Sequence, residues 1–509
     1  AAVEDSGATA VMTAYNQVNG TSMSDHEYLI SDVLRDEWDF DGLVMSDWWG
    51  TRSTVQAARA GLDLEMPGIR IEQFVPDETE IDFDAPETPD VADQPPFFGD
   101  RLRDAVESGT VAEGVIDRKV RRILQTMHSL GRFEGQSGGA IDTPEHRALA
   151  REIAIEGAVL LRNDGVLPLA GEESLALLGP HADSAKIGGG GSSEVSPVTQ
   201  VSPLEELQDR IDVTDERGVE PIGESSTFKT DDGPSDGEAD FDAAIEAAAA
   251  ADVAIVVAQD DATEFVDRNS LGLPGRQDEL IEAVADTADH TVVVLRTSGP
   301  VEMPWLDAVD AVLETWYPGQ ADGEALAQLL FGDAEPGGRL PVTFGYSVDD
   351  YPTGHERTFP GTDGRVHYDE GVFVGYRYFD REGIDPAFAF GHGRSYAEFT
   401  YGDSSVDHET DGVTVSVPVE NTGGRAGKTV VQVYARKTAT TVETPDRELV
   451  GFRSVELDAG ERREVAVSIA EDELAYYDEQ SGWTIPRGTN ELLVGQSSRS
   501  IEGTLSVEL

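Results

Sequence analysis

An aspartate that follows an apolar run and precedes two tryptophans is the first feature of this chain that could do chemistry. In the run GLVMSDWWG, Asp47 ends a strand-like segment and is followed by Trp48 and Trp49. A carboxylate at the end of a buried strand can attack the anomeric carbon of a sugar, and the flat indole faces can stack on its C–H groups. A chain with 99 acidic residues also places some aspartates beside tryptophans by chance. The motif alone is therefore compatible with sugar cleavage or with no function.

Other motifs that suggest chemistry lack an essential part. The four glycines Gly188–Gly191 are not followed by the Gly-Lys-Ser/Thr ending of a phosphate-binding loop. His26 and Glu27 have no second histidine four residues after the first, and the nine histidines show no metal-ligand spacing. The absence of cysteine excludes disulfides, thiolate metal ligands and a cysteine nucleophile. We therefore expect no metal site.

Short strands and amphipathic helices alternate at the start of the chain, which is typical of parallel βαβ units. The expected elements are strands at 9–16 and 42–49, a helix at 26–38 and a helix-strand cycle at 54–67. Parallel sheets carry their chemistry at the carboxyl ends of the strands, and Asp47 lies at such an end. Three such units are too few for an eight-stranded barrel, which takes about 250 residues.

The segment after these units is predicted to end in a helical region and a linker. Residues 68–97 are acidic and rich in proline without a sustained period, so they predict a loop. A helix is expected over 101–131, with an interruption near Gly114 and a cap at Gly131. Residues 134–143 are predicted to form a linker.

A second alternation of helices and strands occupies residues 144 to 346. Its near-continuous Val, Ile and Leu strands predict a parallel sheet covered on both faces. The expected strands are 174–180, 252–259, 290–297 and 311–318, and the expected helices are 148–163, 203–211, 241–251, 278–288 and 323–332. From about residue 400, short alternating strands separated by Gly and Asp turns predict a β-sandwich.

The charge of the chain indicates the solvent in which it works. The 99 acidic and 37 basic residues give a net charge of −62, and the acids are spread over the whole chain. Such repulsion destabilises a compact state unless salt screens it, and at molar ionic strength the Debye length is about 3 Å. Phosphate would be repelled, which excludes a nucleic-acid partner. No apolar run reaches the length of about 18 to 20 residues that a membrane span needs. We predict adaptation to high salt, with the cytoplasm of a high-salt organism favoured and secretion left open.

Taken together, several motifs resemble glycoside hydrolase family 3. The part of that family that holds the nucleophile is similar, in order and spacing, to MTAYNQVNG, LISDVLRDEWDFDGLVMSDWWGTRST and AGLDLEMPG. The similarity continues through AREIAIEGAVLLRNDGVLPL, LPGRQDELIEAV, EPGGRLPVTF and FGHGRSY, and it covers almost the whole chain. It implies the C-terminal part of a (β/α)8 barrel at 1–133, a linker at 134–143, an α/β sandwich domain at 144–395 and an all-β fibronectin type III-like domain at 396–509.

The resemblance also implies an activity and residues that carry it. The family includes retaining, exo-acting β-glucosidases, which hydrolyse terminal non-reducing β-D-glucosyl residues by double displacement without a cofactor. Asp47, in the Ser-Asp-Trp motif, matches the nucleophile. Tyr15 matches a tyrosine that hydrogen-bonds near that nucleophile, and Trp48 matches the aromatic platform beside the leaving group. A tryptophan at this position favours glucosides over xylosides.

The resemblance places the acid/base residue in the second domain, in a loop of the form S-E-G-x-D-R ahead of an L-P-G-x-Q helix. The loop here reads DDATEFVDRNSLGLPGRQ, which puts Glu264 at the glutamate position. Phe265 stands where the family usually has glycine, and a shifted alignment makes Asp260 or Asp261 the candidate. A general acid in a partly desolvated cleft near a second carboxylate has a raised pKa and can protonate the leaving oxygen. The alternative for Glu264 is a solvated acid on a surface loop.

Part of the expected sugar site has no counterpart in this chain. In the family, the first barrel strands supply an aspartate, an arginine and a Lys-His pair for the sugar hydroxyls, and hydrogen bonds to the ring contribute several kcal/mol in the transition state. We therefore expect the chain to be nearly inactive alone, with a complementing chain or an N-terminal segment completing the barrel. The alternatives are a degenerate homologue that binds a glycan or a second chain without turnover, and a β-xylosidase of the same family. The expected partner is a β-glucoside or oligosaccharide, with neither nucleic acid nor membrane.

Overall fold

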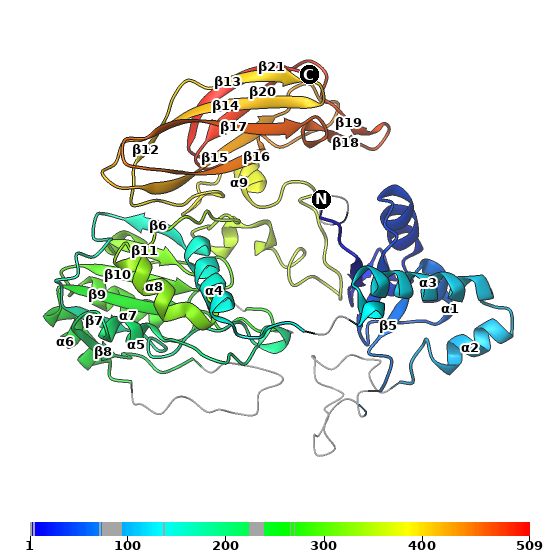
Figure 1. The fold of residues 1–509 in the computed structure, drawn as a ribbon, viewed down its shortest axis with the longest axis horizontal. Coiled ribbons are helices and arrows are strands. Elements are labelled where there is room, and N and C mark those ends of the chain that lie inside the picture. The colour runs from blue at the N-terminus through cyan, green and yellow to red at the C-terminus, as the bar shows by residue number, and fades with distance from the viewer. Residues whose placement is uncertain are drawn as a thin grey trace. The chain divides into compact units, whose positions relative to one another are not determined.

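The computed structural model describes residues 3, 6–70, 73, 94–135, 138–222, 239–264, 266–268 and 270–509. The chain forms two compact units, Ala1–Ala140 and Ile141–Leu509 (Figure 1). Most of the acidic loop expected at 68–97 lies outside the described residues, as does Phe265. The domain boundaries inferred from the family resemblance stay predictions.

The first unit contains a parallel sheet with the order β1-β4-β5, as the βαβ pattern predicts. Its strands are β1 (Ala10–Thr13), β4 (Leu43–Trp48) and β5 (Leu64–Met66), and the short strands β2 (Gln17–Val18) and β3 (Thr21–Ser22) form a separate pair. The π-helix η2 (Tyr28–Glu37) leads from β1 toward β4, and α1 (Val55–Ala60) connects β4 to β5. Val44 packs with apolar residues of both helices, so the sheet is covered where β4 begins.

A buried ion cluster fixes the start of β4. The Asp63 carboxylate, whose side chain is fully buried, accepts hydrogen bonds from Arg35 of η2 at 2.6 Å, Arg122 of α3 at 3.0 Å and the Val44 N–H at 3.0 Å. Lys119 lies close by and donates to the Leu62 carbonyl. Burial lowers the pKa of Lys119 to about 8. Removing one member of such a buried cluster is strongly destabilising, so it holds β4 in register with its helices.

The helical region at the end of the first unit differs from its prediction in one respect. It consists of α2 (Asp100–Glu107) and α3 (Glu113–Ser129), followed by the short turn η4 (Arg132–Glu134). The break falls at residues 108–112, where Gly109 has φ +75°, and Gly114 lies inside α3. Gly131 follows α3 in the left-handed conformation expected of a terminating glycine.

The second unit begins with a six-stranded sheet of order β6-β11-β10-β9-β7-β8. Its strands are β6 (Val159–Asn163), β7 (Leu175–Leu178), β8 (Val213–Glu216), β9 (Val253–Gln259), β10 (Thr291–Arg296) and β11 (Ala311–Glu314). Its helices are α4 (Pro144–Gly157), α5 (Pro203–Gln208), α6 (Phe241–Ala250), α7 (Gln277–Ala285) and α8 (Asp322–Leu330). Every residue of β9 and β10 is buried, and alternate side chains enter two separate apolar clusters, so the prediction of a sheet covered on both faces is confirmed.

One strand of this sheet corrects the sequence-based expectation. Residues 148–163 were expected to be one helix, but α4 ends at Gly157 and Val159–Asn163 form β6, antiparallel to β11. Leu160 and Leu161 are completely buried in opposite apolar clusters, which a strand allows and a surface helix does not. Arg394 pairs with Leu160 on the other side of β6, its N–H donating to the Leu160 carbonyl at 2.8 Å.

The order of the parallel strands in the sheet shows where the loops that follow neighbouring strands lead to opposite sides. Along the chain they run β7, β8, β9, β10, β11, but in the sheet β8 lies on one side of β7 while β9, β10 and β11 extend on the other. The direction of the strand order therefore reverses between β7 and β9. In open α/β sheets, ligands bind in the crevice at the carboxyl ends of the strands at this switch point.

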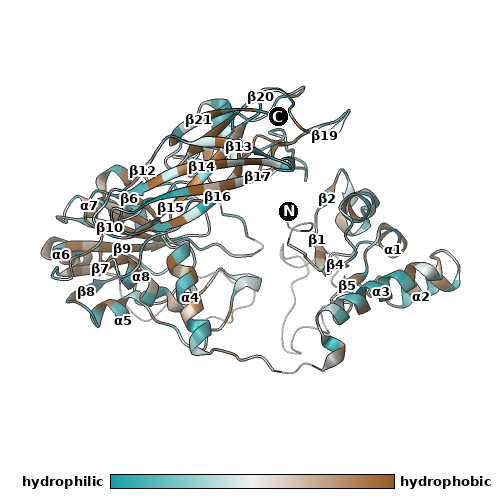
Figure 2. Cartoon of the chain, turned by 45° about the horizontal axis from the view of Figure 1, so that its top comes forward, coloured by the Kyte–Doolittle hydropathy of each residue, from teal (hydrophilic) through white to brown (hydrophobic). Residues whose placement is uncertain are grey.

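The second unit ends in the predicted β-sandwich. One sheet contains β12 (Phe399–Tyr401), β13 (Ser405–Glu409), β14 (Gly412–Asn421) and β17 (Arg462–Ala470), and the other contains β15 (Gly427–Arg436), β16 (Glu448–Leu457), β20 (Thr489–Gly495) and β21 (Ile501–Glu508). Strands such as β14 alternate between hydrophobic and hydrophilic residues along their length (Figure 2), and their buried residues form a valine-rich core. A hairpin of β18 (Tyr476–Asp478) and β19 (Gly482–Thr484) lies beside them.

A short helix before the sandwich is tied to it by buried charge. Asp380 of α9 (Tyr376–Glu382) is almost fully buried and pairs with Arg447 at 2.8 Å and Arg499 at 3.2 Å, both from the sandwich. The remaining helices of the chain that the structure assigns are single 3-10 turns: η1 (Met23–Asp25), η5 (Gly191–Ser193), η6 (Leu306–Ala308), η7 (Gly319–Ala321), η8 (Val348–Asp350), η9 (Pro352–Gly354) and η10 (Asp472–Leu474).

Candidate active site

The candidate site of the first unit is the carboxyl end of β4. Because β1 and β4 are parallel and Thr13 pairs with Ser46, the residues just after β1 come alongside Asp47. The Tyr15 hydroxyl donates a hydrogen bond to Asp47 Oδ1 at 3.0 Å, and the N–H of Trp48 donates to the same oxygen at 2.7 Å. No described residue donates to Oδ2. One carboxylate oxygen is therefore held and the other is left for a reaction.

The two tryptophans are held in a strained turn. Trp49 has φ +54°, an unfavourable backbone conformation for a bulky residue, and its N–H donates to the Met66 carbonyl at 2.8 Å. Its indole Nε1–H donates to the Ile69 carbonyl at 2.9 Å. The Trp48 ring meets the Trp49 ring edge to face, with centroids 5.8 Å apart, and is 37% exposed. An exposed, braced indole next to a carboxylate is suited to contact a sugar face.

The candidate site of the second unit lies at the switch point of the six-stranded sheet. Glu264 is on the loop after β9 and is partly buried, and Gly188–Gly191 are on the loop after β7. The Ser192 N–H donates to Glu264 Oε2 at 2.6 Å, and the Glu264 N–H donates to the Gly190 carbonyl at 3.2 Å. No sequence pattern predicted a contact between these two loops. One signal could have predicted the contact: four consecutive glycines follow β7, the strand that borders the switch point.

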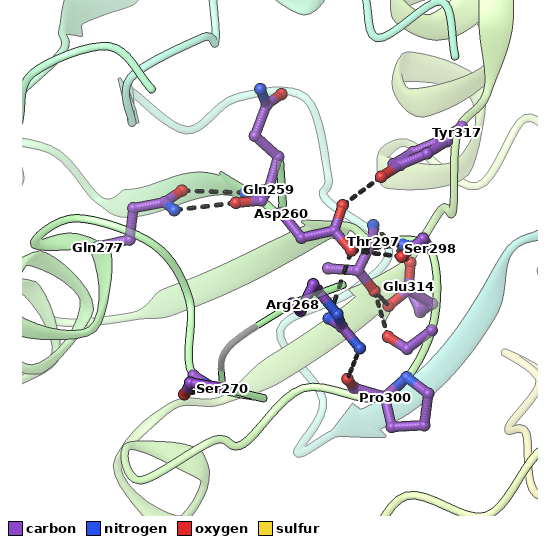
Figure 3. A network of polar contacts seen from close by, with 12 residues as sticks. Gln259, Asp260, Arg268, Ser270, Gln277, Thr297, Ser298, Pro300, Glu314 and Tyr317 are labelled. Carbon is purple, nitrogen blue, oxygen red and sulfur yellow. Dashed lines mark hydrogen bonds and ion pairs between the residues drawn. The ribbon is translucent and has the colours of Figure 1, made fainter. Parts of the chain in front are cut away.

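Asp260, the alternative acid/base candidate, is the centre of a buried network (Figure 3). Its side chain is 2% exposed. Oδ2 accepts from the Ser298 N–H at 2.9 Å, the Ser298 hydroxyl at 2.6 Å and Arg268 at 3.4 Å, while Oδ1 accepts from the Tyr317 hydroxyl. Burial and the bond to Asp260 raise the pKa of Tyr317. Both Asp260 oxygens are therefore occupied by the protein, whereas Asp261 is exposed.

Glu314, at the end of β11, has a different environment. It is fully buried, and it accepts hydrogen bonds from the Thr297 hydroxyl at 2.7 Å and the Trp316 N–H at 2.7 Å. Burial raises the pKa of Glu314 to about 8, although these hydrogen bonds act in the opposite direction. The group is mostly protonated at neutral pH and supports the end of the sheet on which the Asp260 network is built.

The structure brings some of the predicted residues together. Tyr15 and Trp48 lie with Asp47 in the first unit, and Glu264, Asp260 and Asp261 lie in the second unit, each described within its own unit. Within the described ranges, no group of three or more His, Asp or Glu side chains is placed to hold a metal ion. No helix in the described part of the chain is long and apolar enough to cross a membrane.

Three family models match the chain. Residues 1–126 match the glycosyl hydrolase family 3 N terminal domain, residues 158–376 match the glycosyl hydrolase family 3 C-terminal domain, and residues 429–498 match the fibronectin type III-like domain. The three matches follow the chain order of the three-stranded parallel sheet, the six-stranded sheet and the sandwich.

Individual proteins give the same result. The chain is 34% identical to a β-glucosidase of Rhizobium radiobacter over 100% of this chain and 78% of that protein, and 37% identical to thermostable β-glucosidase B of Acetivibrio thermocellus over 98% of this chain and 63% of that protein. An exo-α-(1→6)-L-arabinopyranosidase of Bifidobacterium longum is 32% identical, over 98% of this chain and 63% of that protein. Among solved structures, DesR, a β-glucosidase from Streptomyces venezuelae in complex with D-glucose, superposes with a TM-score of 0.88 at 33% identity, covering 100% of this chain and 77% of that one.

Proposed function

Since the chain belongs to glycosyl hydrolase family 3, we propose that it hydrolyses terminal β-D-glucosyl residues with retention, with Asp47 as the nucleophile and Glu264 as the acid/base. The observation that carries the proposal is the held carboxylate of Asp47, whose Oδ1 accepts from Tyr15 and the Trp48 N–H. This orients Oδ2 for attack, beside an exposed indole suited to a sugar.

The proposed reaction has two steps. First, Asp47 Oδ2 forms a bond to the anomeric carbon as the bond to the leaving oxygen breaks, and Glu264 gives that oxygen its proton. The products of this step are a glycosyl ester on Asp47 and a free alcohol. Glu264, now a carboxylate, then takes a proton from water, whose oxygen attacks the anomeric carbon and releases both the sugar and Asp47. No cofactor takes part.

The second-unit geometry favours Glu264 over the other acid/base candidates. Asp260 would have to break hydrogen bonds to Tyr317 and Ser298 and a contact with Arg268 before it reached a substrate. Asp261 is exposed and no described residue holds its carboxylate. Glu264 is held by one main-chain N–H on Oε2 and lies at the switch point, where ligands bind in such sheets.

The proposal also covers which sugar is cleaved and whether the chain contains the whole sugar site. The exposed Trp48 supports a glucoside, but the arabinopyranosidase relative shows that similar chains act on a pentopyranose, and a β-xylosidase is the third candidate. Three strands are described in the first sheet, fewer than the eight of a complete barrel, so we propose that full turnover depends on a complementing chain or further segment. The rival function is glycan binding without turnover.

Covalent labelling tests the proposal directly. The chain, together with the segment or second chain that completes its barrel and in about 3 M KCl to screen its charge, is incubated with the 2,4-dinitrophenyl 2-deoxy-2-fluoro derivatives of β-glucose, β-xylose and α-L-arabinopyranose. We expect the glucosyl derivative to add one sugar to the peptide that contains Asp47, and Asp47→Asn to abolish the label. A label on another residue would refute the nucleophile assignment. Calorimetric binding of cellobiose without any label would favour the glycan-binding function.

A further inference from the structure

The carboxylate of Glu264 is held by a loop other than its own. The segment Gly190–Ser192 belongs to the loop after β7, whereas Glu264 belongs to the loop after β9. The two loops are joined at three points: the Gly190 N–H donates to the Ala262 carbonyl at 3.2 Å, the Glu264 N–H donates to the Gly190 carbonyl at 3.2 Å, and the Ser192 N–H donates to Glu264 Oε2 at 2.6 Å. Both the main chain and the side chain of Glu264 are therefore fixed by this segment.

Only glycine allows this contact at position 191. A Cβ atom there would lie 2.5 Å from the Cβ of Glu264 and 2.9 Å from its Oε2, closer than real Cβ atoms approach other atoms. Gly191 also has φ +82°, in the region that side chains other than that of glycine disfavour. Gly189 is tight as well, because a Cβ there would meet the Ser193 hydroxyl at 3.1 Å and the Ala262 carbonyl at 3.2 Å. The close approach of the loop to Glu264 thus accounts for the glycine at position 191, and contacts with Ser193 and Ala262 account for the one at position 189.

The base of the Glu264 loop is braced separately. Asp260 at its start and Arg268 near its end are 3.4 Å apart, and both are tied to the loop after β10, Asp260 through Ser298 and Arg268 through the Pro300 carbonyl at 3.0 Å. This brace fixes where the loop leaves and rejoins the sheet, but it lies several residues from the Glu264 carboxylate. The carboxylate itself is oriented by Gly191 and Ser192.

We propose that Gly190–Ser192 is the positioning element of the acid/base: its close glycine contact and the Ser192 N–H set the direction of the Glu264 carboxylate, so that proton transfer to the leaving oxygen depends on a loop remote in sequence. The proposal rests on the proposed role of Glu264. The glycine run, which lacks the ending of a phosphate-binding loop, would thus have a role in positioning Glu264.

The positioning role can be tested by comparing leaving groups. An alkoxide must be protonated as it leaves, whereas dinitrophenolate is stable enough to leave with almost no help from an acid. In the chain together with whatever completes its activity, Glu264→Gln is expected to lower kcat/KM for an alkyl β-glucoside by about 100-fold or more, and that for the dinitrophenyl glucoside by about threefold at most. Gly191→Ala should reproduce this selective loss. The matched control is Gly171→Ala, since Gly171 has φ +83° but a Cβ there meets nothing within 4 Å. It should leave the ratio of the two kcat/KM values unchanged.

The outcomes separate the two proposals. If Glu264→Gln shows no selective loss, the acid/base assignment is wrong. If Glu264→Gln shows it while Gly191→Ala behaves like Gly171→Ala, the positioning role is wrong and the function stands. Should Gly191→Ala not fold, judged by its thermal unfolding, Ser192→Pro removes the N–H that bonds Oε2 without adding a Cβ at 191. A selective loss in Ser192→Pro supports the positioning role, and an equal loss on both substrates overturns it.

Discussion

The Tyr15 hydroxyl lies 3.0 Å from Oδ1 of Asp47 and joins the ends of two parallel strands through one hydrogen bond. The bond leaves the other carboxylate oxygen unengaged among the described residues and fixes its direction. It also explains why a tyrosine two residues after β1 matters to a carboxylate on β4.

Replacing Tyr15 by phenylalanine should slow the reaction without unfolding the protein. A hydrogen bond to a charged group contributes about 1.5 to 3 kcal/mol, so Tyr15→Phe is expected to lower kcat/KM for aryl glucosides by about 10- to 100-fold. The control is Tyr28→Phe, because Tyr28 is an exposed tyrosine on η2. Equal rates for Tyr15→Phe and the wild type would show that the orientation of Asp47 does not depend on this bond.

Replacing Asp260 should cost stability and leave the proton-transfer step intact. Asp260→Ala leaves Arg268 without its carboxylate and the Tyr317 and Ser298 hydroxyls without their acceptor, so we expect a loss of about 3 kcal/mol or more in the free energy of unfolding. Asp261→Ala, at an exposed position, should change it by less than about 0.5 kcal/mol. Urea unfolding measures both. An Asp260 variant of normal stability that fails only on poor leaving groups would make Asp260 the acid/base.

The protonation of Glu314 predicts a pH dependence of stability. Its pKa is raised by burial to about 8, whereas the unfolded chain has a value near 4.5. Between these values the folded state holds a proton that the unfolded state has lost, so this residue makes the free energy of unfolding fall as the pH rises from about 4.5 to 8. Glu314→Gln removes the linkage. The stability of the wild type relative to this variant should therefore be highest at or below about pH 4.5 and lowest above about pH 8. A difference that stays constant over this range would contradict the prediction.

The charge of the chain predicts a strong response to salt. With a net charge of −62, raising KCl from 0.1 to 1 M shortens the Debye length from about 10 to about 3 Å and should raise the Tm markedly. Calorimetric scans at each salt concentration measure it, with equimolar sucrose as the control for excluded-solute effects. A Tm that rises equally in sucrose would show that charge screening is not the cause.

The strands that carry Asp47 and precede Tyr15 could be predicted from the sequence, because apolar runs mark β1 and β4 clearly. The apolar run placed Asp47 near the end of β4, whereas Tyr15, which follows β1, was singled out by the family resemblance. The contact between Glu264 and Gly191 could not be predicted in this way. It depends on β7 and β9 being neighbours in the sheet, and the polar strand β8 between them in sequence was not recognised.

Local patterns also failed where tertiary packing decided the structure. The run Val159–Asn163 continues a helical pattern in sequence, yet it pairs with β11 because the two buried leucines at its centre need opposite faces of a sheet. The fold classes of all three parts were nevertheless predictable from two patterns: buried strands that alternate with helices in the two α/β parts, and strands of strictly alternating residues in the sandwich.

The pairing of Leu160 with Arg394 has a consequence for engineering. Leu160 lies near the start, and Arg394 near the end, of the α/β domain predicted at 144–395, and the His392 ring also donates a hydrogen bond to the Leu161 carbonyl at 2.8 Å. A domain whose two ends meet on one strand edge can be spliced into a host protein, or have its ends joined and a new opening cut elsewhere, with little disturbance to its interior. We therefore expect that the six-stranded sheet can be transferred as one unit into another protein, together with the glycine loop and Glu264.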